Sequence, residues 1–150
     1  MASLKQIIHN QYLQILQDKI DVFQDMISDL TDDSLNDAKG SAGDKHETGL
    51  SMMHLEQEKL TTKLREAIEQ KVFLEKINPD QIHSKVNLGS LVTTNKMIVY
   101  LSCALPKLTI DEQNYFGIST NSPLGEQLMG QSVGHDFQLN GVSYQIIAVD

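Results

Sequence analysis

The chain has 150 residues, of which 40% are hydrophobic, and its 20 acidic and 12 basic groups give a net charge of −8. This composition argues against wholesale disorder, and we expect no transmembrane helix and no secretory signal, because neither a run of about 18 apolar residues nor a basic, apolar N-terminus is present. We expect a cytoplasmic protein, since the single cysteine cannot form an internal disulfide, and the acidity disfavours tight binding of free nucleic acid.

A boundary between two domains is predicted at Asn78-Pro79-Asp80. Residues 1–78 contain no proline, whereas the three prolines, at 79, 106 and 123, all lie in the second half. Glycine is also more frequent there. We therefore expect a first domain over residues 1–78 and a second over residues 79–150.

Residues 1–78 are predicted to form an antiparallel coiled-coil hairpin. Apolar residues recur at alternating spacings of three and four, as in a heptad repeat, at Leu13, Leu16, Ile20, Phe23, Ile27 and Leu30. A second, weaker seam follows at Met53, Gln57, Leu60, Leu64, Ala67, Lys71 and Leu74. The small, polar segment 37–44 separates the seams, so two helices, the first over residues 4–36, should fold back on each other with their tip near residues 38–49.

Residues 79–150 are predicted to form a small, mostly antiparallel sheet with one short helix, which makes the whole chain α+β. Residues 91–94 and 97–101 are rich in β-formers and flank a turn at Asn95-Lys96. Asn140-Gly141 suits a type I′ hairpin between residues 137–139 and 142–146. The helix should begin with Ser122 as its N-cap and Pro123 at its first position, and should end at Gly130.

The chain carries no complete catalytic motif: a Gly-rich phosphate loop, HExxH, CxxC and GxSxG are all absent. Cys103 belongs to the apolar segment 99–105, which favours a core residue over a nucleophile. The histidines lack the usual metal-ligand spacing. We interpret His9 and His54, both on expected helices, as ordinary surface or boundary residues.

An acidic face is expected along the first helix. Asp21, Asp25, Asp29 and Asp33 are four residues apart and share one side. A solvated face is the more common interpretation of such a pattern. The alternative is a docking face for a basic partner.

The expected hairpin tip holds two carboxylates, Asp44 and Glu47, three residues apart. At the start of the second helix they would project from the same turn, where they could hold Mg²⁺ through their oxygens or its bound waters. Asp-x-x-Glu ahead of a heptad seam is also the pattern of a capping box, with Asp44 as N-cap and Glu47 at N3. Spacing alone favours the cap, and one pair could serve both purposes.

The sequence resembles the bacterial transcript cleavage factors of the GreA/GreB family over nearly its whole length. The segment Ser122-Pro123-Leu124-Gly125-x-x-Leu128-x-Gly130 matches the family's Ser-Pro-Ile/Leu-Gly and Leu-x-Gly pattern. The Asn140-Gly141 hairpin occupies the position of the family's final strands. At the expected tip, Gly43-Asp44-x-x-Glu47 matches the family's Gly-Asp-x-x-Glu.

The resemblance implies a coiled-coil hairpin followed by an FKBP-like C-terminal domain, and a protein that acts on RNA polymerase. The C-terminal domain, with Ser122, Pro123, Leu124 and Gly125 as a docking motif, would bind the rim of the polymerase secondary channel. The hairpin would pass through the channel, where Asp44 and Glu47 would hold Mg²⁺ jointly with the polymerase. The expected outcome is cleavage of backtracked RNA near its 3′ end. The chain would be an accessory factor rather than an enzyme, with no membrane partner.

Two departures from the family pattern leave alternatives open. After Glu47 the chain continues Thr48-Gly49-Leu50-Ser51, where the family typically has Asn-Ala-Glu-Tyr, and no basic patch on the hairpin is evident. A non-cleaving regulator of the secondary channel on the same scaffold is the first alternative. An FKBP-like prolyl isomerase or chaperone with a coiled-coil handle is the second, although the C-terminal half has few aromatic residues with which to line a pocket.

Overall fold

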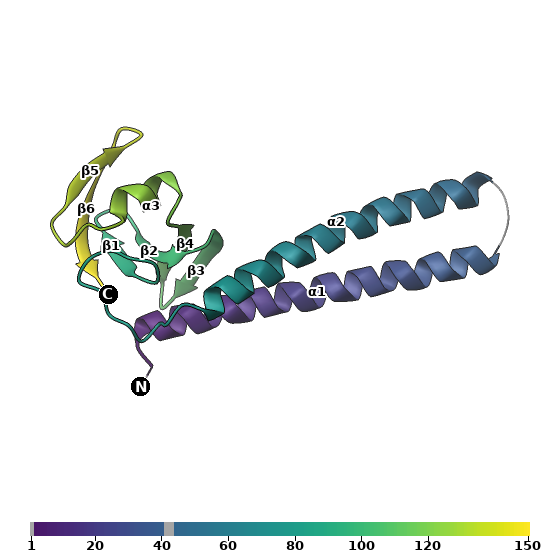
Figure 1. The fold of residues 1–150 in the computed structure, drawn as a ribbon, viewed down its shortest axis with the longest axis horizontal. Coiled ribbons are helices and arrows are strands. Elements are labelled where there is room, and N and C mark those ends of the chain that lie inside the picture. The colour runs from purple at the N-terminus through teal and green to yellow at the C-terminus, as the bar shows by residue number, and fades with distance from the viewer. Residues whose placement is uncertain (1, 41–43) are drawn as a thin grey trace. The chain divides into compact units, whose positions relative to one another are not determined.

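The chain is an α+β protein that consists of a long helical hairpin and a sheet-containing unit (Figure 1). The computed structural model describes the backbone of residues 2–40 and 44–150 and the side chains of residues 2–32 and 51–150. Its contacts define two compact units: Gln14–Lys71, and Met1–Leu13 together with Val72–Asp150. Within the part of the chain that is described, no helix combines the length and apolar character needed to span a bilayer.

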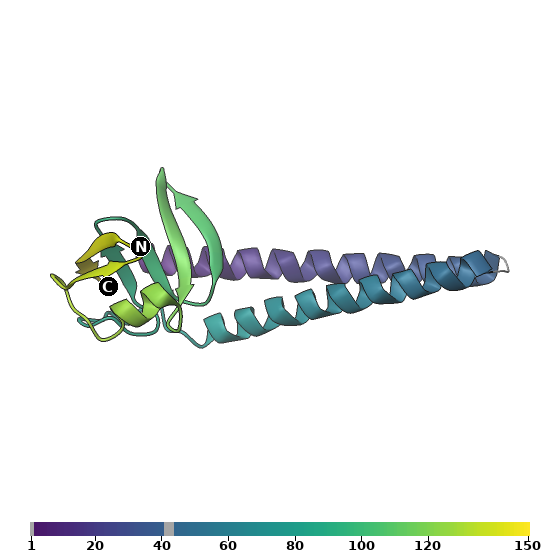
Figure 2. The same cartoon turned by 90° about the horizontal axis from the view of Figure 1, so that it is seen from above.

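The hairpin unit is formed by α1 (Leu4–Gly40) and α2 (Asp44–Glu75), which lie side by side and antiparallel in Figures 1 and 2. Four seam residues are buried: Leu16 and Ile20 of α1, and Leu60 and Ala67 of α2. The other seam positions of this unit whose side chains are described are half-buried. The predicted heptad seams are therefore confirmed, since an a/d stripe is the part of each helix that faces the other.

The polar position in the second seam has a partner across the hairpin. Gln57 Nε2 donates a hydrogen bond to Thr31 Oγ1 at 2.8 Å, and Thr31 Oγ1 in turn donates to the carbonyl of Ile27. This pairing fixes which turns of the two helices lie opposite each other. The first helix also runs further than predicted, to Gly40, and the second begins at Asp44.

The borders between the units fall inside both long helices. The sequence places a boundary at residues 78 and 79, whereas the contacts group the first turns of α1 and the last turn of α2 with the sheet. Ile8 and Tyr12 of α1 and Leu74 of α2 are fully buried there. A change in composition marks where the helices stop, but burial decides which unit each turn belongs to.

The described residues form one six-stranded sheet with the strand order β3-β4-β2-β1-β6-β5. Its strands are β1 (Leu91–Thr94), β2 (Ile98–Ser102), β3 (Leu105–Ile110), β4 (Gln113–Ser119), β5 (Asp136–Leu139) and β6 (Val142–Val149). The strands predicted at 91–94, 97–101 and on both sides of Asn140-Gly141 are confirmed. Asn140 and Gly141 have φ values of 52° and 78°, as a type I′ turn requires. The sequence did not predict β3 and β4.

The expectation of an antiparallel sheet is wrong at one pair, because β2 and β4 run parallel. The chain leaves β2, crosses β4 through Cys103-Ala104, and places β3 on the far side of β4. Gly117 of β4 permits this crossing: a Cβ there would lie 2.6 Å from Leu105 Cβ and 3.1 Å from the Cys103 carbonyl oxygen. The sheet is therefore mixed, with β2 and β4 as its parallel pair among the described strands.

One apolar core holds the sheet and the short helix α3 (Pro123–Leu128) together. Val92, Val99 and Leu101 of the sheet pack with Leu128 of α3 and Ile146 of β6, all at most 1% exposed. Leu124 packs against the same cluster from α3. The core thus fixes the position of α3 and of the Ser-Pro-Leu-Gly segment at its start.

Candidate functional site

The predicted metal-binding residues lie at the start of α2. Asp44 is the first residue of this helix, and Glu47 follows in its first turn. A spacing of three places both on one side of a helix. Their side chains lie outside the described residues, so metal binding and capping both stay predictions. Elsewhere on the described side chains, no cluster of three or more His, Cys, Asp or Glu residues could hold a metal ion.

The acidic face of α1 is solvated in its described part. Asp18, Asp21, Asp25, Asp29 and Asp32 are all exposed. Gln14 donates a hydrogen bond to Asp18, and Gln17 donates one to Asp21, both at 2.9 Å along the same helix. These bonds orient two of the carboxylates but do not bury them. Asp33 lies outside the described side chains.

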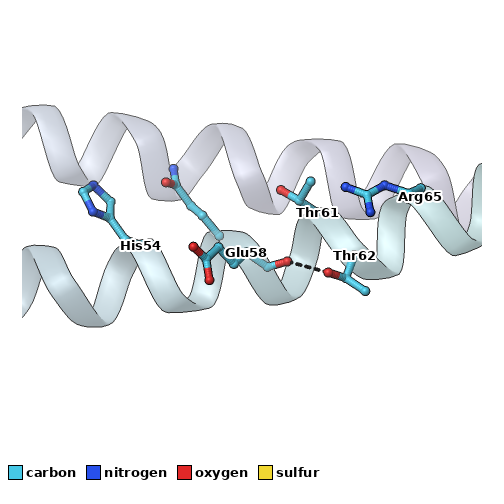
Figure 3. A pocket seen from close by; sticks show the side chains of 6 residues that line it. His54, Glu58, Thr61, Thr62 and Arg65 are labelled. Atoms are coloured by element: carbon cyan, nitrogen blue, oxygen red, sulfur yellow. Dashed lines mark hydrogen bonds between the residues drawn. The ribbon is translucent and has the colours of Figure 1, made fainter.

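A polar groove runs along one side of α2 within the hairpin unit (Figure 3). The lining residues are His54, Gln57, Glu58, Thr61, Thr62 and Arg65. Thr62 Oγ1 donates to the Glu58 carbonyl oxygen at 3.0 Å, which occupies one of the two hydroxyls. The groove offers one guanidinium, one imidazole and one carboxylate that could contact a polar partner. Sequence reasoning did not identify it, although His54, Glu58, Thr61 and Arg65 recur at spacings of three and four.

The Ser-Pro-Leu-Gly segment is explained largely by local structure. Ser122 caps α3 as predicted: its Oγ accepts from Gly125 N at 3.1 Å and donates to the Ser119 carbonyl at 2.6 Å. Pro123 starts the helix, and a Cβ on Gly125 would collide with the Ser119 carbonyl oxygen. Pro123 is the exposed member of the segment, and Gly125 is buried. The polymerase-docking role of the segment stays a prediction.

A buried polar cluster joins the start of α1 to the sheet. His9 Nδ1 lies 2.8 Å from the Tyr100 hydroxyl, and their rings meet edge to face. Lys5 Nζ donates to the Gln81 carbonyl, and the Tyr12 hydroxyl donates to the Pro106 carbonyl at 2.9 Å. The interpretation of His9 as a surface or boundary residue is wrong, because its side chain is only 4% exposed. Sequence reasoning missed this cluster, and the available signal was the spacing of residues 5, 8, 9 and 12.

Burial shifts the acid–base behaviour of this cluster. Burial, and then the nearby charge of Lys5, lower the pKa of His9. Burial raises the pKa of Tyr12 to about 12 and also raises the pKa of Tyr100. The cluster is therefore neutral at His9 and at both tyrosines near neutral pH, which suits a structural contact more than proton transfer.

Cys103 follows directly after β2 and is half-buried. Burial raises the pKa of its thiol, whereas a nucleophilic cysteine needs the thiolate. This supports the predicted role as a core residue.

Comparisons with known proteins identify no family. No protein-family profile matches the chain, and no curated protein matches it. Among solved structures, the chain is similar to the transcription factor Gfh1, with a TM-score of 0.36 and 16% sequence identity over 92% of each chain. A likeness of this degree establishes neither a family nor an activity for the chain.

Proposed function

We propose that this protein is a transcription factor of the GreA/GreB type that acts through the secondary channel of RNA polymerase and stimulates Mg²⁺-dependent cleavage of backtracked RNA. The observation that carries the proposal is the position of Asp44 and Glu47, in the first turn of the second of two long antiparallel helices. The 37 residues of α1 span about 55 Å at 1.5 Å per residue. The end of α1 that precedes these two residues is therefore far from the start of the same helix.

Each part has a proposed task. The sheet-containing unit, an FKBP-like domain in this proposal, docks at the rim of the channel through the segment that begins at Ser122 and Pro123. Asp44 and Glu47 would hold Mg²⁺ together with carboxylates of the polymerase, because carboxylate oxygens are the ligands this ion prefers. This Mg²⁺ would be the second of two, beside one held by the polymerase alone, and such a pair would stabilise negative charge on the entering and leaving oxygens of a phosphodiester displacement. The chain supplies only part of that site and is an accessory factor, not an enzyme.

The test is an RNA cleavage assay on backtracked elongation complexes of polymerase from the same organism, with Mg²⁺ present. Adding the wild-type chain should shorten the RNA from its 3′ end. Asp44→Asn and Glu47→Gln should each slow this shortening at least about tenfold, the effect of disturbing a metal site, while binding to polymerase is unchanged. Asp25→Asn, an exposed carboxylate on the same hairpin, is the matched control. Full activity of both tip variants would contradict the assigned roles.

A non-cleaving regulator of the channel is the second candidate. The sequence after Glu47, Thr48-Gly49-Leu50-Ser51, favours it, because it lacks the acidic and aromatic residues usual in cleavage factors at this position. Polymerase binding that alters initiation or pausing, without RNA shortening at any Mg²⁺ concentration, would support this candidate over the first.

A further inference from the structure

Strand β5 is the last strand of the sheet, with β6 as its neighbour (Figure 1). It pairs only with β6, in the register Leu139 with Val142 and Phe137 with Tyr144. Across a two-residue turn these are the pairs that exchange hydrogen bonds. The N–H and C=O groups of the alternate residues, Asp136 and Gln138, therefore point away from β6.

On the side of β6 that faces away from β5, the backbone groups of Ser143 and Gln145 already have a partner, Asn95. Asn95 Nδ2 donates to the Ser143 carbonyl at 3.2 Å, and Asn95 Oδ1 accepts from Gln145 N at 2.8 Å. Asn95 N also donates to the Gln145 carbonyl at 3.1 Å. Among the described residues, no such partner covers the outward backbone groups of Asp136 and Gln138.

The opposite edge of the sheet is protected, which makes the open edge at β5 distinctive. Pro106 of β3 has no N–H, and its carbonyl already accepts from the Tyr12 hydroxyl. Lys107 is exposed beside it, and the β3–β4 register shifts between Leu105 and Leu108. Proline, lysine and irregular register are devices that prevent strand addition. Within its paired residues β5 has none of these three.

The surroundings of β5 indicate what could pair with it. A groove beside the strand is lined by Asn95, Asp136, Phe137, Gln138, Ser143, Tyr144 and Gln145. Asp136 is exposed and is the one charged residue in this lining. On the other face of β5, Phe137 is stacked between His135 and Tyr144, with ring centroids 5.7 and 5.2 Å away. An added strand would thus meet a carboxylate on one face and an aromatic stack on the other.

We propose that the outer edge of β5 binds an extended segment of a partner protein as an additional strand, and that this segment alternates basic with apolar residues. Backbone bonds to Asp136 and Gln138 would anchor it, a basic residue would face Asp136, and an apolar residue would pack beside Phe137. A second copy of the chain is a poorer occupant, because it would bring another net charge of −8 and another Asp136 to the same edge. This binding does not depend on the proposed action on RNA polymerase.

The probe is a short synthetic peptide, blocked at both ends, in which lysine and valine alternate. With the full-length chain, the peptide should slow amide hydrogen exchange at Asp136 and Gln138 about tenfold. The amides of Phe137 and Leu139 should not change, because they already bond to β6. A peptide that alternates glutamate and valine should give no protection, and neither should one with lysines and valines in separate blocks.

Two substitutions at Gln138 separate backbone pairing from side-chain contact. Gln138→Pro removes the outward N–H without breaking a bond to β6, and Gln138→Thr keeps that N–H. Both lose the side-chain bond from Gln138 Nε2 to Ser143 Oγ, which makes them a matched pair. The proline variant should bind the lysine–valine peptide at least about fivefold more weakly than the threonine variant, the effect of one lost hydrogen bond.

Several results would overturn the proposal. These are an absence of protection at Asp136 and Gln138, equal binding of the glutamate peptide, and equal affinity of the two Gln138 variants. Concentration-dependent protection without any peptide would also overturn it, because the occupant would then be a second copy of the chain.

Discussion

Removing the Tyr100 hydroxyl is expected to lower the free energy of unfolding of the sheet-containing unit by about 1–3 kcal/mol. This hydroxyl lies 2.8 Å from His9 Nδ1, and the two side chains are 0% and 4% exposed. Tyr100→Phe keeps the ring in its edge-to-face contact with His9 but leaves Nδ1 without a partner. The cost is that of an unpaired buried polar group, since water does not reach the site to replace the lost bond.

Acidification should weaken the same contact. Burial and the charge of Lys5 lower the pKa of His9 below its ordinary 6.5, so the unfolded chain takes up a proton that the folded chain excludes. The stabilisation is therefore fully present above about pH 6.5 and is lost as the pH falls from there through the lower pKa of the folded chain, with a slope of at most about 1.4 kcal/mol per pH unit for this group. Burial also lowers the pKa of His83, which adds an effect of the same sign.

Urea titrations followed by the NMR signals of the core residues Val99 and Leu101 would measure both effects. They should be run near pH 8 and near pH 5.5 on the wild type, on Tyr100→Phe, on His9→Gln, and on a variant in which both His9 and His83 are replaced by Gln. His54→Gln, at an exposed position in the hairpin unit, is the matched control.

Either of two results would refute this reasoning. One is a Tyr100→Phe variant that unfolds at the same urea concentration as the wild type. The other is a fall in stability between about pH 8 and about pH 5.5 that persists in full when both His9 and His83 are replaced.

Three further predictions concern other parts of the fold. Gly125→Ala should destabilise the sheet-containing unit by more than about 2 kcal/mol in urea titrations, because its Cβ would collide with the rigid Ser119 carbonyl; unchanged stability would contradict the crowding. Gln57→Leu should raise the melting temperature of the hairpin by circular dichroism, since an apolar residue at this seam position adds more than the bond to Thr31. Alkali should unfold the sheet-containing unit as Tyr12 ionises: its raised pKa of about 12 means that its stabilisation is present below about pH 10 and is lost as the pH rises through the folded value. Tyrosinate absorbance measures this, and Tyr12→Phe should remove its share.

The features predicted correctly from the sequence are those that local spacing determines. The heptad seams needed only the alternation of three and four, and Asn140-Gly141 specifies its own turn. The β3–β4 hairpin was missed because its turn residues, Asp111 and Glu112, adopt φ values of 50° and 66° without being glycine. Strand β3 also contains Pro106 and Lys107, and a proline argues against a strand when only the sequence is known.

Long-range features could not be predicted from local spacing. The parallel pairing of β2 with β4 depends on a chain crossing at Gly117. No local sequence pattern predicts such a crossing. His9 and Tyr100 are 91 residues apart in the sequence, so nothing near either residue indicates their contact. The roles of Asp44 and Glu47 stay predictions, because their side chains lie outside the described residues.

The hairpin begins and ends in the same compact unit, because α1 starts in the sheet-containing unit and α2 finishes in it. The residues before and after Gln14–Lys71, which are Met1–Leu13 and Val72–Asp150, belong to one unit. Deleting one heptad from each helix, at opposed turns in the register set by Gln57 and Thr31, would keep the seam in phase. The reach of the tip would then shorten in steps of about 10 Å. Hairpins of different length could thus be built on the same sheet-containing unit.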